Sequence, residues 1–117
     1  MSFTDLLAEL KVEYVSGLPQ KIETIREHQQ TEDLIALRTD WHKLKGNGKT
    51  YGLPEISELA TVVESYCLEK PDSALQVVGS AIEILCDIHF ARLKNQEHNL
   101  GSDPRFLALC DQKLAAA

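Results

Sequence analysis

Residues Thr31 to Gly52 read TEDLIALRTDWHKLKGNGKTYG, and this stretch decides how the rest of the chain folds around it. Its apolar and small residues recur at the i, i+3, i+4 spacing that places side chains on one face of an α-helix. They are Leu34, Leu37, Trp41, Leu44, Gly48 and Tyr51. Thr31 is a suitable N-cap, and the two acidic residues after it favour the positive end of the helix dipole. The stretch is therefore predicted to form one amphipathic helix.

His42 is predicted to lie on the water-facing side of this helix, about 100° around the axis from Trp41. The residues at −4, +3, +4 and +7 from it share its face. They are Arg38, Lys45, Gly46 and Lys49. An imidazole among cations, beside a residue without a side chain, indicates a site for an anionic partner group. A free histidine side chain has a pKa of about 6.5, so its lone pair is available as a nucleophile at neutral pH.

The composition is that of one soluble globular domain covering residues 1–117. The hydrophobic fraction is 44% and the charged fraction 26%, which is ordinary for such a domain. A net charge of −6 argues against nucleic-acid binding. No apolar run approaches the length needed to span a bilayer, and the sequence has no signal-peptide pattern, so we expect no membrane association and a cytoplasmic location. The three cysteines form no CxxC pair and are expected to be free, mostly buried thiols.

Helical patterns flank the central stretch on both sides. Phe3 to about Lys11 is a short amphipathic segment, a break is expected near Gly17, and Pro19 is placed in the first turn of a longer helix. The remaining predicted helices run from Glu55 to Glu69, from Ser73 to about Asn95 and from Arg105 to Leu114. Short connections between amphipathic helices favour antiparallel neighbours. We therefore expect an all-α fold: an antiparallel up-down four-helix bundle with its core at about residues 14–95, and short extra N- and C-terminal helical segments, the latter at residues 103–114.

The other histidines suit structural roles better than chemical ones. His28 is predicted to be a solvated surface residue near a helix end, and His89 a hydrogen-bonded residue on the apolar face that also carries Leu93. A four-helix bundle can bind two metal ions through Glu-x-x-His pairs. The residues three positions before the four histidines are Ile25, Thr39, Cys86 and Asn95. None is a carboxylate, so no metal site is predicted.

The run His42-Lys43-Leu44-Lys45-Gly46, followed by Gly52, resembles the H-x-L-K-G signature of histidine-containing phosphotransfer (HPt) domains. The resemblance covers roughly Tyr14 to Leu93, because the helices before and after the motif also match the family pattern. Val63-Glu64 falls where the family's next helix closes with Leu-Glu. Trp41 departs from the pattern, since the family usually has a small residue just before the histidine.

This resemblance implies a phosphorelay function in a two-component system. His42 would accept a phosphoryl group and pass it to or from the aspartate of a response-regulator receiver domain. Lys45 would assist catalysis by offsetting the added negative charge, with Lys49 and Arg38 near it. The receiver domain would supply the aspartate and Mg²⁺, so no cofactor is expected on this chain. No ATP-binding region is evident in the sequence, so no autonomous kinase or ATPase activity is expected.

The surface around His42 is predicted to bind a receiver domain, a sensor histidine kinase or both, and the chain is expected to be a monomer. Its predicted partner-binding residues are Ile35, Arg38, Thr39, Gly46 and Lys49. Two alternatives remain at this point. In the first, the chain is a bundle-type adaptor that binds such a partner without carrying phosphate. In the second, His42 is only a solvated helix residue. A histidine general-base enzyme would need a second catalytic group, which the sequence does not place.

Overall fold

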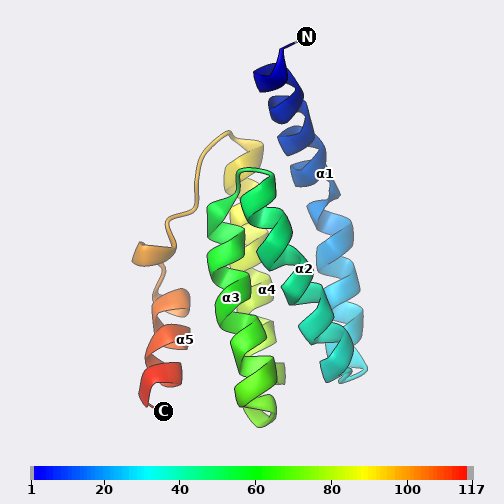
Figure 1. Cartoon of the computed structure of the whole chain (residues 1–117). Coiled ribbons are helices and arrows are strands. Elements are labelled where there is room, and N and C mark those ends of the chain that lie inside the picture. The colour runs from blue at the N-terminus through cyan, green and yellow to red at the C-terminus, as the bar shows by residue number, and fades with distance from the viewer. Residues whose placement is uncertain (1, 116–117) are drawn as a thin grey trace.

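The computed structural model describes the backbone of residues 2–115 and the side chains of residues 2–112. The described chain is helical and contains no strand, which confirms the all-α class (Figure 1). Its elements are α1 (Phe3–Gln30), α2 (Leu34–Thr50), α3 (Pro54–Glu69), α4 (Pro71–Leu93), the 3-10 helix η1 (Leu100–Ser102) and α5 (Pro104–Ala115). α1 packs against α2 and α4, α3 packs between α2 and α4, and α5 lies against α3 and α4.

α1 is one continuous helix of 28 residues, so the predicted break near Gly17 and the separate N-terminal segment are wrong. A capping box formed by Ser2 and Asp5 starts the helix, and Pro19 lies inside it, exposed to solvent. A proline in a helix interior costs about 3 kcal/mol. Large apolar residues on both sides of Pro19 are buried, each contributing roughly 1.5–3 kcal/mol, which is enough to hold both halves in one helix. They are Tyr14, Val15, Leu18, Ile22 and Ile25.

α2 begins later than predicted, because Thr31 belongs to the end of α1. The Thr31 hydroxyl donates a hydrogen bond to the Glu27 carbonyl oxygen at 3.2 Å, and Glu32 adopts a φ of +55° that redirects the chain. Asp33 is the N-cap of α2, and its carboxylate accepts a hydrogen bond from the Ala36 amide at 3.0 Å. The N-cap is therefore Asp33 and not Thr31.

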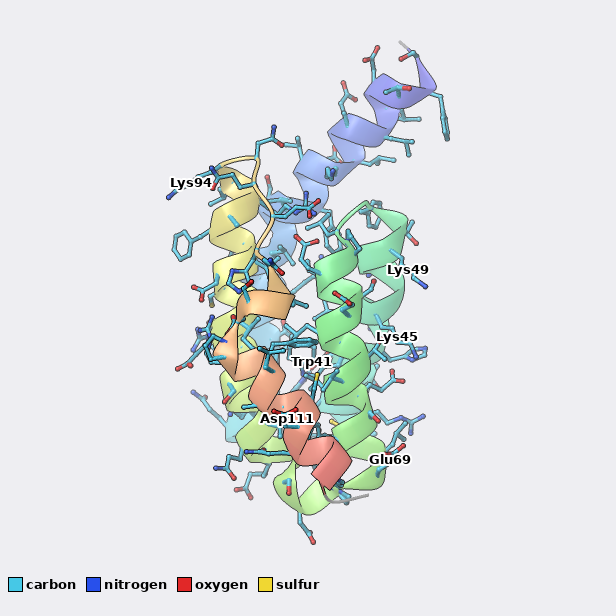
Figure 2. The ribbon with its side chains drawn as sticks, turned by 90° about the vertical axis from the view of Figure 1, so that its left-hand side faces the viewer. Trp41, Lys45, Lys49, Glu69, Lys94 and Asp111 are labelled. Atoms are coloured by element: carbon cyan, nitrogen blue, oxygen red, sulfur yellow. The ribbon has the colours of Figure 1, made fainter. Side chains whose placement is uncertain are left out.

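The apolar stripe of α2 faces the core as predicted. Leu37, Trp41 and Leu44 are buried, and the residues at the two ends of the stripe, Leu34 and Tyr51, are half-buried. Trp41 is fully buried and points into the bundle (Figure 2). The assignment of Trp41 to the core is therefore confirmed.

The last turn of α4 differs from its predicted packing. Leu93, expected in the core, is 59% exposed. Arg92 turns inward instead, with its side chain 8% exposed, and its guanidinium donates hydrogen bonds to both carboxylate oxygens of Glu55 at 2.7 and 2.8 Å. This bidentate pair joins the end of α4 to the start of α3. His89, one turn earlier, is half-buried with its ring 6.0 Å from that of Phe90.

By length and composition alone, α4 is apolar enough to cross a bilayer. The expectation that no segment reaches that length is wrong on those two criteria. Burial explains the composition of α4, since Val78, Ile82 and Leu85 are buried in the core. A helix that packs against neighbours on several sides is apolar around most of its circumference.

α5 is anchored to the bundle through its first two turns. Leu109 is buried, Phe106 and Cys110 are half-buried, and the Tyr66 hydroxyl donates a hydrogen bond to the Leu109 carbonyl oxygen at 2.6 Å. These contacts hold the helix predicted from Arg105 to Leu114 against the bundle, and the side chain of Leu114 lies outside the described part of the chain. The three cysteines are free, as predicted, but each is half-buried and not mostly buried.

α2 and α3 approach each other closely at Gly48. A Cβ atom there would lie 2.6 Å from Ser57 Oγ, 2.8 Å from the Ser57 amide nitrogen and 2.9 Å from the Leu53 carbonyl oxygen. Two hydrogen bonds secure the same region: the Ser57 hydroxyl donates to the Lys45 carbonyl oxygen at 2.6 Å, and the Leu53 amide donates to the Gly48 carbonyl oxygen at 2.7 Å. The spacing of α2 and α3 therefore depends on the absence of a side chain at residue 48.

His28 joins α1 to α2, so its prediction as a merely solvated residue is wrong. Its Nδ1 lies 2.5 Å from Oδ2 of Asp40, and its side chain is 31% exposed. The hydrogen bond to Asp40 raises the pKa of His28 above its ordinary value, and the nearby charges of Asp40, Asp33 and Glu27 act in the same direction against a smaller effect of burial.

Alanine substitutions at the two neighbouring glycines of α2 should have opposite effects. Gly48→Ala is expected to lower the free energy of unfolding by about 1–3 kcal/mol, because its Cβ overlaps the backbone of α3. Gly46→Ala should raise it by up to about 1 kcal/mol, since alanine is the better helix former and a Cβ there meets nothing within 4 Å. Urea unfolding measures both. Equal effects at the two positions would contradict the close contact at Gly48.

The His28–Asp40 pair should make stability depend on pH. Because the folded-state pKa of His28 is raised, its stabilisation is fully present below the unfolded-state pKa of about 6.5 and is lost as the pH rises through the folded-state pKa. His28→Gln should therefore destabilise the protein more at about pH 5.5 than at about pH 9. Urea unfolding of both proteins at both pH values checks this, and a loss independent of pH would argue against the pair.

Candidate functional site

His42 lies near the middle of α2, on the side away from the buried stripe, and its side chain is 71% exposed. The predicted exposure is therefore confirmed. Trp41 and Leu44 are buried on the opposite face, so the backbone that carries the imidazole is fixed by the core. The ring is thus presented to solvent from a rigid element.

Glu64 of α3 holds one nitrogen of the imidazole. His42 Nδ1 lies 2.6 Å from Glu64 Oε2, and the Glu64 side chain is 11% exposed. Its other oxygen lies 3.5 Å from Lys45 Nζ. An ionised carboxylate only accepts hydrogen bonds, so a neutral imidazole in this position carries its proton on Nδ1 and its lone pair on Nε2. Nε2 is the ring nitrogen that remains for a reaction with an incoming group.

A cleft of about 560 Å³ opens beside His42, between α2 and α3. Lys45, Gly46 and Lys49 line it from α2, and Pro54, Ser57, Glu58 and Thr61 line it from α3. Lys45 and Lys49 project outward from the bundle while Trp41 points inward (Figure 2). Two ammonium groups on one wall make the cleft attractive to an anionic group, with Lys45 partly neutralised by Glu64.

Gly46 lies on the exposed face next to His42, and no internal contact requires glycine there. A Cβ at residue 46 would meet nothing within 4 Å. A glycine in a helix interior costs roughly 1 kcal/mol relative to alanine. This differs from Gly48, where the contact with α3 excludes a side chain.

Three of the predicted partner-binding residues lie outside the cleft, toward the start of α2. Ile35 is 81% exposed, and the Thr39 hydroxyl donates a hydrogen bond to the Ile35 carbonyl oxygen at 3.0 Å. Arg38 is exposed on the side of α2 that faces α3. Its charge lowers the pKa of the Cys67 thiol, but burial has the larger effect and raises that pKa overall. Lys45, Gly46 and Lys49 therefore lie beside His42 in the cleft. The other three predicted residues lie nearer the N-terminus of the same helix.

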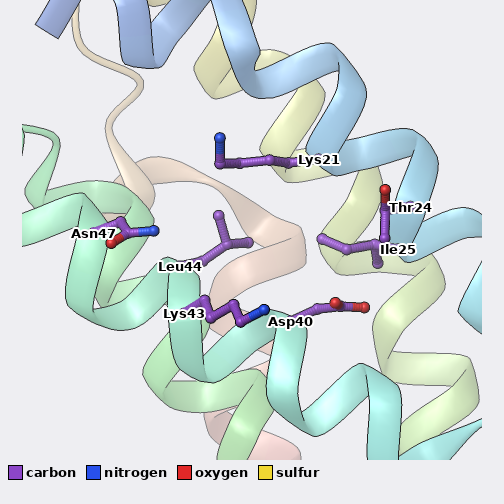
Figure 3. A pocket seen from close by; sticks show the side chains of 7 residues that line it. All are labelled: Lys21, Thr24, Ile25, Asp40, Lys43, Leu44 and Asn47. Carbon is purple, nitrogen blue, oxygen red and sulfur yellow. The ribbon is translucent and has the colours of Figure 1, made fainter. Parts of the chain in front are cut away.

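Lys43 lies on the other side of α2. Together with Lys21 and Thr24 of α1 and with Asp40, it lines a smaller cavity of about 230 Å³ between α1 and α2 (Figure 3). The cations that the sequence placed around His42 are thus divided between two sides of the helix. Only Lys45 and Lys49 reach the cleft beside the imidazole.

Glu64, Glu58 and Ser57 were not predicted to be site residues. Glu64 could have been found from its position, because it follows Ala60 by four residues on a face of α3 that is otherwise apolar. A carboxylate on such a face needs a polar partner, and an imidazole on the neighbouring helix is one. Nothing in the sequence alone distinguishes Glu58 from other solvated acidic residues.

One group of described residues outside this site has the spacing of metal ligands. Atoms of Asp87, His98 and Asp103 all lie within 4.8 Å of one another. The Arg105 guanidinium donates hydrogen bonds to Asp87 and, at 2.8 Å, to Asp103, and its contact holds the pKa of Asp103 well below its usual range. The Arg105 guanidinium supplies the positive charge that a metal ion would bring to this cluster. The cluster thereby joins the start of α5 to α4.

Comparison with known proteins agrees with the geometry of the His42 site. A family model described as Hpt domain matches residues 9–116. No curated protein and no solved structure gives a match. Domains of this family take part in histidine phosphotransfer in two-component phosphorelays, where they interact with receiver domains and kinases. Since the match covers nearly the whole chain, this protein belongs to the Hpt domain family.

Proposed function

We propose that this protein is a phosphorelay intermediate that carries a phosphoryl group on Nε2 of His42 and exchanges it with the aspartate of a response-regulator receiver domain. The observation that carries this proposal is the exposed imidazole whose Nδ1 is held by Glu64 at 2.6 Å. That hydrogen bond leaves the lone pair on the nitrogen that faces away from Glu64. His28 and His98 also contact carboxylates, but their side chains are only 31% and 23% exposed, whereas that of His42 is 71% exposed and its second ring nitrogen is open to a partner.

The proposed reaction is a single phosphoryl transfer in each direction. The Nε2 lone pair attacks the phosphorus of an aspartyl phosphate, a P–N bond forms, and the P–O bond to the aspartate breaks. The aspartate leaves as a carboxylate, and Nδ1 keeps its proton throughout. The ring gains a positive charge because both nitrogens are then substituted. Glu64, in contact with Nδ1, offsets that charge, which lowers the barrier to the attack.

Lys45 and Lys49 are proposed to act on the phosphoryl oxygens from the wall of the cleft. Their charges compensate the negative charge brought by the phosphoryl group. Phosphoryl transfer also needs metal neutralisation and an in-line approach. We propose that the receiver domain supplies the Mg²⁺ together with its aspartate, and that this chain contributes no cofactor.

The proposed docking surface is the exposed face of α2 with the neighbouring part of α3. Gly46 has open space above it, so an incoming domain can come close to the backbone beside His42. Ile35, with its side chain 81% exposed, and Thr39 supply an uncharged contact area below the imidazole. Arg38 and Lys49 extend the basic area in both directions along the helix. A sensor histidine kinase is the second proposed partner of this face.

We also propose that α1 to α4 form the antiparallel up-down bundle of a single domain covering residues 1–117, with its core at about residues 14–95. The turns between successive helices are short, which supports antiparallel neighbours. α5 is then an addition that covers part of the α3–α4 surface.

His42→Gln should abolish phosphorylation by a phosphorylated receiver and leave the helix content unchanged, because the side chain is exposed. Label transfer followed by circular dichroism checks both. His98→Gln is the matched control, since it changes a histidine outside the site. A mutant that still accepts phosphate would place the acceptor elsewhere. Receiver binding without any labelling of the wild-type protein would favour the adaptor function.

Removing Glu64 should change the tautomer of His42 and slow phosphotransfer. In Glu64→Leu the preference for a proton on Nδ1 is lost, and the transfer rate should fall about tenfold or more, equivalent to about 1.4 kcal/mol. Nitrogen-15 NMR of the imidazole, recorded above its titration range, reports the tautomer directly.

Glu58→Leu is the control for Glu64→Leu, because Glu58 lies in the same cleft but is not the group bonded to Nδ1. Glu64→Gln separates the two effects of the carboxylate, since an amide oxygen can still accept from Nδ1 but carries no charge. An unchanged tautomer and rate in Glu64→Leu would contradict the assigned role of Glu64.

A further inference from the structure

The cavity between α1 and α2 lies on the side of α2 away from the cleft beside His42 (Figure 3). Its volume is about 230 Å³, the space of roughly eight water molecules or of an organic molecule of about ten non-hydrogen atoms. Ile25 and Leu44, which are 1% and 2% exposed, form its apolar floor. Because the core fixes both residues, the cavity is formed before anything enters it.

Three polar side chains around this floor lack a counter-group. Lys21 extends from α1, and Lys43 and Asn47 extend from α2 (Figure 3). Within the described part of the chain, the side chains of Lys43 and Asn47 make no hydrogen bond or ion pair. The half-buried Lys21 ammonium has only the face of the Tyr14 ring, 5.0 Å from its centroid. A cation that is partly removed from water is costly without a counter-ion, so the cavity favours an anion.

Asp40 contributes a carboxylate to the wall of the cavity. Its Oδ2 already has a partner, since it lies 2.5 Å from Nδ1 of His28. Asp40 also precedes Asn47 by seven residues, which is about two turns of α2, so the two side chains lie at opposite ends of the cavity. The end near Asn47 is therefore positive, in a chain whose net charge is −6.

We propose that this cavity binds a small organic anion, in which a phosphate or carboxylate group is joined to a compact apolar body. The anionic group lies between Lys21 and Lys43 and accepts a hydrogen bond from the Asn47 side-chain amide. The apolar body lies against Ile25 and Leu44. An uncharged molecule of the same shape lacks the first contact and an inorganic anion lacks the second, so both should bind more weakly.

The proposed site is separate from the cleft beside His42, because the two sites share no lining residue. A ligand in the cavity contacts both α1 and α2, so its binding should stabilise the folded protein in proportion to its occupancy. The proposal does not depend on the phosphorelay role.

Titration of the full chain with phenyl phosphate and with benzoate, followed by proton–nitrogen NMR, tests the proposal. The two probes share a phenyl ring and differ in the anionic group, so their comparison identifies the preferred group. The backbone amide of Leu44 and the side-chain amide of Asn47 should shift, with a dissociation constant of about 1 mM or below for the better probe. Benzyl alcohol and inorganic phosphate should each bind at least about tenfold more weakly.

Lys21→Met and Lys43→Met each remove one positive charge and keep most of the alkyl side chain. Each should weaken binding of the better probe about fivefold or more, and circular dichroism should show unchanged helicity in both. Lys49→Met is the matched control, because Lys49 is an exposed lysine of the same helix as Lys43 but lines the cleft beside His42. It should bind the probe as the wild type does.

A dissociation constant above about 10 mM for both anionic probes would overturn the proposal. So would binding that Lys49→Met weakens and the other two substitutions do not, because the probe would then occupy the cleft beside His42. Benzyl alcohol bound as tightly as the anions would also overturn it, since the lysines would then have no part in recognition. Phosphoryl transfer to His42 is a separate measurement, and its failure would leave these outcomes unchanged.

Discussion

The close contact between α2 and α3 at Gly48 is the constraint on which the site depends. His42 is on α2 and Glu64 is on α3, so the 2.6 Å distance between their side chains is set by how closely the two helices approach. Ser57 occupies the space that a Cβ atom at residue 48 would need, and its hydroxyl donates a hydrogen bond to the Lys45 carbonyl oxygen. A wider spacing would separate the imidazole from its carboxylate without altering either residue. Packing in the core thus determines which nitrogen of an exposed ring carries the proton.

The carboxylate beside His42 is compatible with a phosphate-binding role because of its distance from the reacting nitrogen. Coulomb energy falls with separation, and Glu64 contacts the near nitrogen of the ring while a phosphoryl group on Nε2 would lie across the ring from it. Glu64 therefore lies closer to the positive charge of the ring than to the negative charge of the phosphoryl oxygens. Lys45, 3.5 Å from Glu64, reduces the repulsion between Glu64 and those oxygens further.

Periodicity was sufficient to predict the helical class, the buried side of α2 and the exposed side that carries His42. It could not predict contacts between helices. The continuity of α1 through Pro19 depends on apolar burial on both sides of the proline, and the start of α2 depends on whether Thr31 ends one helix or begins the next. In α4, the inward turn of Arg92 in place of Leu93 follows from the position of Glu55 on α3. Glu64 was visible as a family position, but its bond to the imidazole is a property of the packed pair of helices.

The imidazole is mounted on a helix that the core fixes on one side and α3 fixes on another, and this has a consequence for control. The described residues that line the site all belong to α2 and α3, so none of them lies on a loop that could open or close it. In the proposed role, the fraction of His42 that is phosphorylated then depends on the ratio of phosphorylated to unphosphorylated partner. Net flow reverses when that ratio reverses. In the proposed role, the direction of net transfer would then be set by the partner proteins, because the described walls of the site are two packed helices.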